Sequence, residues 1–295
     1  MIRYRLPFLV TVLFCLSVYP RTAFSVPPYG PDQTDFTVVV MDPMAGPLAC
    51  DCVQGYAQRQ YEALADYLTH KTGKTFRVVW SESLEVAIDG DALGKADLVI
   101  GKDSVIRHES KKIHKAFEPV ASLTDKQGSP NQRGLFVVRQ NSMAASLLDI
   151  DNYEMLLGPE DCEEKHSSPK TTLDDLELKV TFGKEAASCS LAAKQLLAAP
   201  ASAKQVAIIS SYAAPLLEGC GAIKKGDLRV IGETDEVPFI SAFLSDSLST
   251  VTKKLLTDCL TSMKEQPEML LAMETKTGFL SYVPAASPKD GLKKK

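Results

Sequence analysis

Residues 206–249 read VAIISSYAAPLLEGCGAIKKGDLRVIGETDEVPFISAFLSDSLS, and this stretch decides the fold. A short apolar run at 206–209 predicts a buried strand, and residues 213–218 have the spacing of a short helix. A second apolar run follows at 228–231, and a proline-marked segment then enters a third run at 239–244. The order is strand, helix, strand, and then a chain that leaves for another part of the molecule.

The same alternation occurs earlier in the chain. Residues 36–41 form a β-branched run typical of a buried strand, and residues 56–72 place Tyr61, Leu64, Ala65 and Leu68 on one helical face. Strands at 76–80 and 96–101, with a helix at 84–93 between them, complete a β-α-β-α-β unit. Such a unit predicts a parallel, doubly wound sheet with right-handed crossovers.

A second α/β unit follows, joined to the first near residues 133–142. Strands are predicted at 118–123, 134–139, 153–157 and 178–182, and helices at 169–176 and 188–199. Two further helices, at 248–263 and 268–275, precede the end of the chain. The fold class is therefore α/β, with two doubly wound units.

The first residues carry an export pattern. Arg3 and Arg5 precede an apolar run at 6–19, and Ala23-Phe24-Ser25 offers small residues for cleavage. We predict a cleavable signal peptide at 1–25, export to the periplasm or an equivalent compartment, and no stable membrane insertion, because no later run approaches about twenty apolar residues. A net charge of −4 argues against a nucleic-acid partner. Residues 284–295 are expected to be a flexible tail.

Six cysteines remain after signal removal. An even number in an exported chain favours disulfides, and six cysteines allow fifteen full pairings. They are Cys50, Cys52, Cys162, Cys189, Cys220 and Cys259.

Several segments, taken in order, carry a family resemblance. EALADYLTHKTG at 62–73, the strand at 76–79 and ADLVIG at 96–101 resemble the opening of phosphate/phosphite/phosphonate-type periplasmic solute-binding proteins. FEPVASLTDKQGSPNQRGLFVVR at 117–139 and the segment 227–244 are similar to the two places where that family's chain crosses between lobes. The resemblance extends over about residues 36–263.

The resemblance implies a type II periplasmic-binding fold with two lobes and a cleft between them. Lobe 1 would comprise residues 36–133 and 240–283, and lobe 2 residues 134–239. Such a protein is a receptor that closes on a phosphonate, phosphate or related small oxyanion and delivers it to an ABC permease. We expect no cofactor and no catalytic residue, since the sequence has no glycine-rich phosphate loop, GxSxG or HExxH motif.

Ligands of such sheets bind beyond the carboxyl ends of strands, near helix N-termini, and three loops qualify. The first offers Asp42 and Met44, and the second offers Lys102 and Ser104. The third contains His166, Ser167 and Ser168, at the place where the family has a Ser/Thr-rich helix start that grips the oxyanion. These serines fit simple helix capping equally well.

Other readings stay open. Cys50, Cys52, Cys162 and His166 stand on two of these loops and form a donor set suited to zinc or copper(I). Relatives of the family also accompany periplasmic quinoprotein dehydrogenases, so a dehydrogenase partner is an alternative role. No carboxylate that would meet the amine of an aminoalkylphosphonate is visible, and the acidic pair Glu163-Glu164 reads as part of a polar loop.

Overall fold

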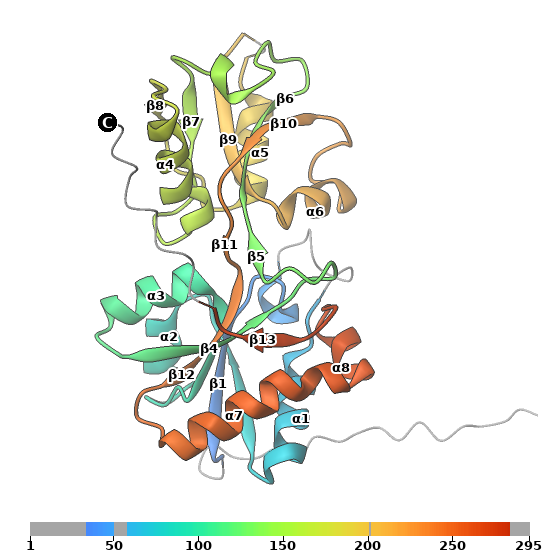
Figure 1. Cartoon of the computed structure of the whole chain (residues 1–295). Helices are drawn as coiled ribbons and strands as arrows, with labels where there is room; N and C mark the ends of the chain where they lie inside the picture. The colour runs from blue at the N-terminus through green and yellow to red at the C-terminus, as the bar shows by residue number, and fades with distance from the viewer. Residues whose placement is uncertain (1–33, 50–57, 201, 284–295) are drawn as a thin grey trace, which may run out of the picture. The chain divides into compact units, whose positions relative to one another are not determined.

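The computed structural model describes residues 34–49, 58–200 and 202–283, and two sheets organise them (Figure 1). The first sheet has the strand order β13-β4-β12-β3-β1-β2. Its strands are β1 Phe36–Met41, β2 Phe76–Trp80, β3 Leu98–Lys102, β4 Phe117–Leu123, β12 Ile240–Ser245 and β13 Phe279–Ser281. β1 pairs in parallel with both β2 and β3, whereas β12 runs antiparallel to β3 and β4.

The second sheet has the order β10-β6-β9-β7-β8. β7 lies parallel to both β8 and β9, and β6 is antiparallel to β9 and β10. Its strands are β6 Gly134–Arg139, β7 Glu154–Leu156, β8 Thr181–Phe182, β9 Gln205–Ser210 and β10 Leu228–Glu233. A two-stranded antiparallel ribbon of β5 Asn131–Gln132 and β11 Val237–Pro238 lies where the chain passes between the sheets in each direction.

The two sheets share one plan. In each, three parallel strands come from a β-α-β-α-β unit, and the strand that has just arrived from the other sheet, β12 or β6, pairs antiparallel with the last of them. The predicted α/β class is confirmed, but each sheet is mixed rather than purely parallel. The reason is that the crossing chain enters each sheet from the opposite end.

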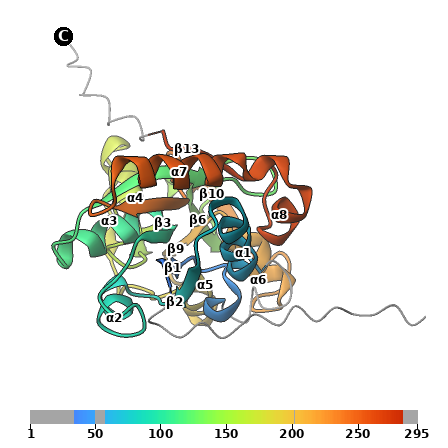
Figure 2. The same ribbon diagram turned by 90° about the horizontal axis from the view of Figure 1, so that it is seen from below.

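Helices cover both faces of each sheet. They are α1 Tyr61–Thr72, α2 Leu84–Asp89, α3 Asp103–Lys112, α4 Ser167–Asp175, α5 Cys189–Ala198, α6 Ala213–Gly219, α7 Thr250–Ser262 and α8 Pro267–Ala272. Single-turn 3₁₀ helices occur at Gly46–Leu48, Leu147–Asp149, Glu163–Lys165 and Met263–Glu265. Figure 2 shows α7 and α2 on opposite sides of the first sheet.

The alternation of β1 explains this double covering. Val38 and Val40 pack with α1 and α7, whereas Val39 and Met41 pack with α2 and α3. β9 does the same in the second sheet, where Ala207 packs with α5 and Ile208 with residues from α4. Because helices cover both faces of such a strand, a ligand can reach its carboxyl end and the loop that follows, but not its faces.

Local signals set the helix ends. α1 stops at Gly73, which takes φ +68°, a conformation that favours glycine. α5 and α7 start where the side chains of Ser188 and Ser249 accept hydrogen bonds from the backbone N–H three residues further on. Among the described residues, no helix combines the length and apolar character needed to cross a bilayer.

Candidate functional site

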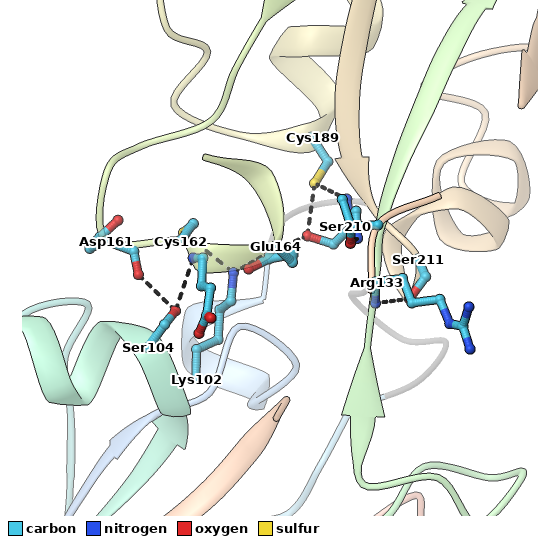
Figure 3. Close-up of polar contacts among 12 residues, drawn as sticks. Lys102, Ser104, Arg133, Asp161, Cys162, Glu164, Cys189, Ser210 and Ser211 are labelled. Atoms are coloured by element: carbon cyan, nitrogen blue, oxygen red, sulfur yellow. Dashed lines mark hydrogen bonds and ion pairs between the residues drawn. The ribbon is translucent and has the colours of Figure 1, made fainter. Parts of the chain in front are cut away.

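The carboxyl ends of β3 and β9 bring two polar side chains together with a loop that follows β7. Lys102 is the last residue of β3, Ser210 is the last residue of β9, and Glu164 lies in the 3₁₀ turn Glu163–Lys165 after β7. Carboxyl ends of parallel strands are where α/β sheets bind their ligands. The place predicted from sequence therefore holds a polar centre (Figure 3).

An ion pair joins the two sheets at this centre. Lys102 Nζ lies 2.6 Å from Glu164 Oε1 and 3.3 Å from Cys162 Sγ. Ser210 Oγ donates a hydrogen bond of 2.6 Å to the same Glu164 Oε1. The Lys102 side chain is 8% exposed and the Glu164 side chain 0%, so water screens this pair little.

Lys102 and Glu164 each shift the pKa of the other group toward its charged form. Burial disfavours the charged form of Lys102, but the nearby Glu164 carboxylate outweighs burial and raises the pKa of the ammonium. Burial likewise disfavours the charged form of Glu164, but Lys102 and Lys165 outweigh it and lower the pKa of the carboxyl. Both groups are therefore charged at neutral pH.

For Cys162, burial outweighs the nearby positive charges and favours the neutral form. It raises the pKa of the Cys162 thiol in spite of Lys102 and Lys165 nearby, so the neutral thiol, rather than the thiolate, stands beside the ammonium.

A second contact between the sheets lies beside the first. Ser104 lies in the first turn of α3. Its Oγ donates a hydrogen bond of 2.7 Å to the carbonyl oxygen of Asp161 and accepts one of 3.2 Å from the backbone N–H of Glu163. Figure 3 shows Ser104 and Lys102 reaching the same loop from the first sheet. The loop after β7 is thus held by both side chains.

Glycine makes this arrangement possible. A Cβ on Gly134, the first residue of β6, would lie 2.0 Å from the carbonyl oxygen of Glu164. The backbone of the Glu164 turn therefore packs directly on β6, and a side chain at position 134 would displace it.

A cavity of about 380 Å³ opens next to Lys102. Strand ends of the first sheet and the loops and helices beside the second sheet form its wall, which combines an apolar surface with two lysines and two carboxylates. The lining includes Met41, Leu48, Glu82, Lys102, Val105, Asp161, Cys162, Lys165, Cys189, Tyr212 and Leu216. Its size suits a small ligand with a charged group and an apolar part.

The first predicted loop places Asp42 and Met44 away from this cavity. Asp42 is fully buried and accepts hydrogen bonds from Arg59 (2.8 Å), Tyr61 (2.6 Å) and the backbone N–H of Met44 (2.9 Å). Met44 packs against the core and lines a different cavity of about 490 Å³ beside Arg59. In this structure Asp42 organises the loop after β1.

The second predicted loop, with Lys102 and Ser104, supplies the residues at the centre of the site. The third places His166 with its Nδ1 3.0 Å from the carbonyl oxygen of Gly158 and its Nε2 2.6 Å from Lys170 Nζ. His166, Ser167 and Ser168 are not among the residues that line the cavity. Ser167 and Ser168 begin α4, and their carbonyl oxygens accept hydrogen bonds from the side chains of Thr171 and Thr172.

The cysteines of the described residues are free thiols. Cys162, Cys189 and Cys259 are buried and Cys220 is exposed, so the expected disulfides do not form among these four. The backbone N–H of Ser210 donates to Cys189 Sγ at 3.4 Å, and Cys259 packs in the core of the first sheet.

The proposed metal ligands Cys50 and Cys52 lie outside the described residues. Within residues 34–49, 58–200 and 202–283, no three His, Cys, Asp or Glu side chains cluster as metal ligands would. The zinc or copper(I) site therefore stays a prediction without structural support.

Two residues of the centre were missed from sequence. Glu164 lies in the predicted polar loop, but it was not selected as a site residue, and its side chain is fully buried against Lys102 and Ser210. The predicted strand at 206–209 stops one residue before Ser210, which is not among the predicted site residues. The position of Ser210 directly after an apolar strand is the signal that would have found it.

Comparisons with known proteins agree with this geometry. Two mixed α/β sheets with a polar cavity at their carboxyl ends define a two-lobed binding protein of the type II periplasmic class. The family model for the periplasmic substrate-binding protein of phosphonate ABC transporters matches residues 54–290, and this chain belongs to that family. It is a family of transport receptors, not of enzymes.

Solved structures show the same fold at low sequence identity. The binding-protein component of an ABC phosphonate transporter from Pseudomonas aeruginosa is 16% identical, with 85% of this chain and 82% of that chain covered and a TM-score of 0.57. PhnD1 from Prochlorococcus marinus, solved with methylphosphonate, is 12% identical (86% and 93% covered, TM-score 0.59). XAC2383 from Xanthomonas citri, solved with ATP, is 14% identical (84% and 91% covered, TM-score 0.60). The comparison with curated protein sequences gave no match.

Proposed function

We propose that this chain is an exported receptor that binds a small phosphonate or related oxyanion in the cavity beside Lys102 and delivers it to an ABC permease. The observation that carries the proposal is the cavity itself, which has Lys102 and Lys165 in its wall and is lined by elements that belong to both α/β units. A ligand held by both sheets would favour the closed arrangement, which is how a receptor of this class signals that it is loaded.

The chemistry of the wall supports this ligand class. The ammonium groups of Lys102 and Lys165 suit a phosphonate head, and Met41, Val105 and Leu216 suit a short alkyl substituent. Glu82 and Asp161 also line the cavity, so a ligand with an added amine has carboxylates within the same space. Export through the predicted signal peptide at 1–25 would place the receptor where such ligands arrive.

Binding measurements test the proposal. Purified protein without its signal segment is titrated calorimetrically with methylphosphonate, phosphate, phosphite and sulfate, and a receptor should bind at least one of them with micromolar affinity or better. Lys165→Met should weaken that binding at least tenfold, which corresponds to about 1.4 kcal/mol. Lys74→Met is the matched control, because Lys74 is exposed and pairs with Asp35 outside the cavity. No binding of any oxyanion by the wild type would refute the proposed ligand class.

A further inference from the structure

We propose that Glu164 is a built-in ligand: its carboxylate occupies the anion position at Lys102, closes the two sheets on each other without an external ligand, and competes with any oxyanion that enters the cavity. The inference rests on the proposed function for its competitive part only. The part of the proposal that concerns closure depends instead on the contacts of Glu164 with Lys102 and Ser210.

The Glu164 carboxylate lies between two donors. Glu164 Oε1 lies 2.6 Å from an ammonium at the end of β3 and 2.6 Å from a hydroxyl at the end of β9. An ammonium and a hydroxyl at the carboxyl ends of strands from two different sheets are the donors that a bound oxyanion would use. An oxygen of the protein's own side chain already has both (Figure 3).

The charged groups of the cavity wall leave little attraction for an anion. Lys102 lines the cavity, yet its positive charge is already paired with Glu164. The remaining charged groups of the wall are Glu82, Asp161 and Lys165, two acidic and one basic. An incoming anion therefore meets little free positive charge unless it displaces Glu164 from Lys102.

One oxygen of the Glu164 carboxylate lacks a hydrogen bond among the described residues. Glu164 Oε2 is buried and has no hydrogen-bond partner among the described residues. Burying a carboxylate with one oxygen unpaired is unfavourable, and this lowers the cost of moving it aside. Glu164 is therefore held firmly enough to close the cleft and remains displaceable by a better anion.

Direct side-chain contacts connect the two α/β units. Lys102 ends β3 of the first sheet and Ser104 lies in α3, which follows it, whereas Asp161, Cys162 and Glu164 come from the loop after β7 of the second sheet. The protein makes these contacts directly, with no ligand between the two sides. Without Glu164, the buried Lys102 ammonium is better hydrated when the sheets separate.

Two measurements on the mature chain test the proposal. Small-angle X-ray scattering of ligand-free protein should give a compact wild type and a larger radius of gyration for Glu164→Ala. Glu163→Gln is the matched control: its carboxyl lies next in sequence and does not contact Lys102, so the variant should stay as compact as the wild type. Thermal unfolding confirms that each variant is folded. A wild type as expanded as Glu164→Ala would overturn the closure.

Calorimetry with methylphosphonate and phosphate tests competition. Glu164→Gln keeps a side chain of the same size but loses the charge, so it should bind the anion about tenfold more tightly or better, which is about 1.4 kcal/mol. Glu163→Gln should bind like the wild type. Equal or weaker binding by Glu164→Gln would overturn the competition.

The outcomes separate this inference from the proposed function. If neither wild type nor variants bind any oxyanion, the proposed ligand class and the competition both fail, while the scattering result still decides whether Glu164 closes the sheets. If the wild type binds an oxyanion and Glu164→Gln binds it no more tightly, the proposed receptor function is supported and the proposal that Glu164 is a built-in ligand is refuted.

Discussion

Replacing Lys102 with alanine removes the partner charge of a carboxylate that has no exposed surface. Glu164 is 0% exposed, and among the described residues it would keep the hydroxyl of Ser210 as a hydrogen-bond donor and the charge of Lys165 nearby. Removing one partner of a buried, hydrogen-bonded ion pair costs about 3–5 kcal/mol, because the other charge stays buried without its direct partner. We expect Lys102→Ala to lie in this range.

The opposite replacement should cost less, and the structure gives the reason. Lys102 lines the cavity, so in Glu164→Ala water can reach the ammonium from that side, whereas no cavity adjoins Glu164 among those described. We expect roughly 1–3 kcal/mol for Glu164→Ala, within the range for a buried polar group that finds partial solvation. The double variant Lys102→Met/Glu164→Met should recover most of the loss, since apolar residues often replace a buried pair at little cost.

Urea unfolding followed by circular dichroism measures these differences. For a unit of this size each kcal/mol moves the melting temperature by roughly 2–4 °C, so Lys102→Ala should melt about 10 °C below the wild type. Ser104→Ala, which removes a neutral contact between the same elements, is the control and should cost about 0.5–1.5 kcal/mol. A loss below about 1 kcal/mol for Lys102→Ala would show that the pair behaves like an exposed salt bridge and would refute the reasoning.

Two further predictions follow from the same centre. Gly134→Ala places a Cβ 2.0 Å from the carbonyl oxygen of Glu164, so we expect a loss of about 1–3 kcal/mol in urea unfolding, and a loss within error of zero would contradict the close packing. The pKa of Glu164 is lowered in the folded state, so its stabilisation is fully present above the ordinary carboxyl range near 4.5 and is lost as pH falls through the folded pKa. Stability measured between about pH 6 and pH 3 should therefore fall less steeply in Glu164→Gln than in the wild type, and parallel curves would contradict the assignment.

Most of the fold could be predicted because its signals are local. The run 36–41 is apolar and β-branched throughout, and β1 occupies those six residues. Gly73 marked the end of the first long helix, and α1 ends directly before it. Antiparallel pairing of β12 with β3 was not predicted, because the direction in which a strand enters a sheet depends on the path of the chain between the sheets and not on the residues of the strand.

The site was predictable only in outline. The rule that ligands bind beyond strand ends selected Lys102 and Ser104 from the residues after an apolar run, without knowledge of their partners. The same rule selected Asp42, which the structure places in contact with Arg59 and Tyr61 instead. Position at a strand end is shared by residues that face a cavity and residues that stabilise their own loop, and sequence does not distinguish the two.

Glu164 shows why the rest of the site required the structure. It stands in the segment EDCEEK, whose composition is that of a solvated loop, and its neighbour Glu163 contacts Ser104 through its backbone alone among the bonds described. What buries Glu164 is a lysine 62 positions earlier, in a different sheet, and a serine 46 positions later. A carboxylate in such a loop is ordinarily exposed. Glu164 becomes the counter-ion of Lys102 because the ends of β3, β7 and β9 lie close together in the fold. The sequence feature that accompanies this arrangement is Gly134, whose lack of a side chain leaves room for the backbone of Glu164.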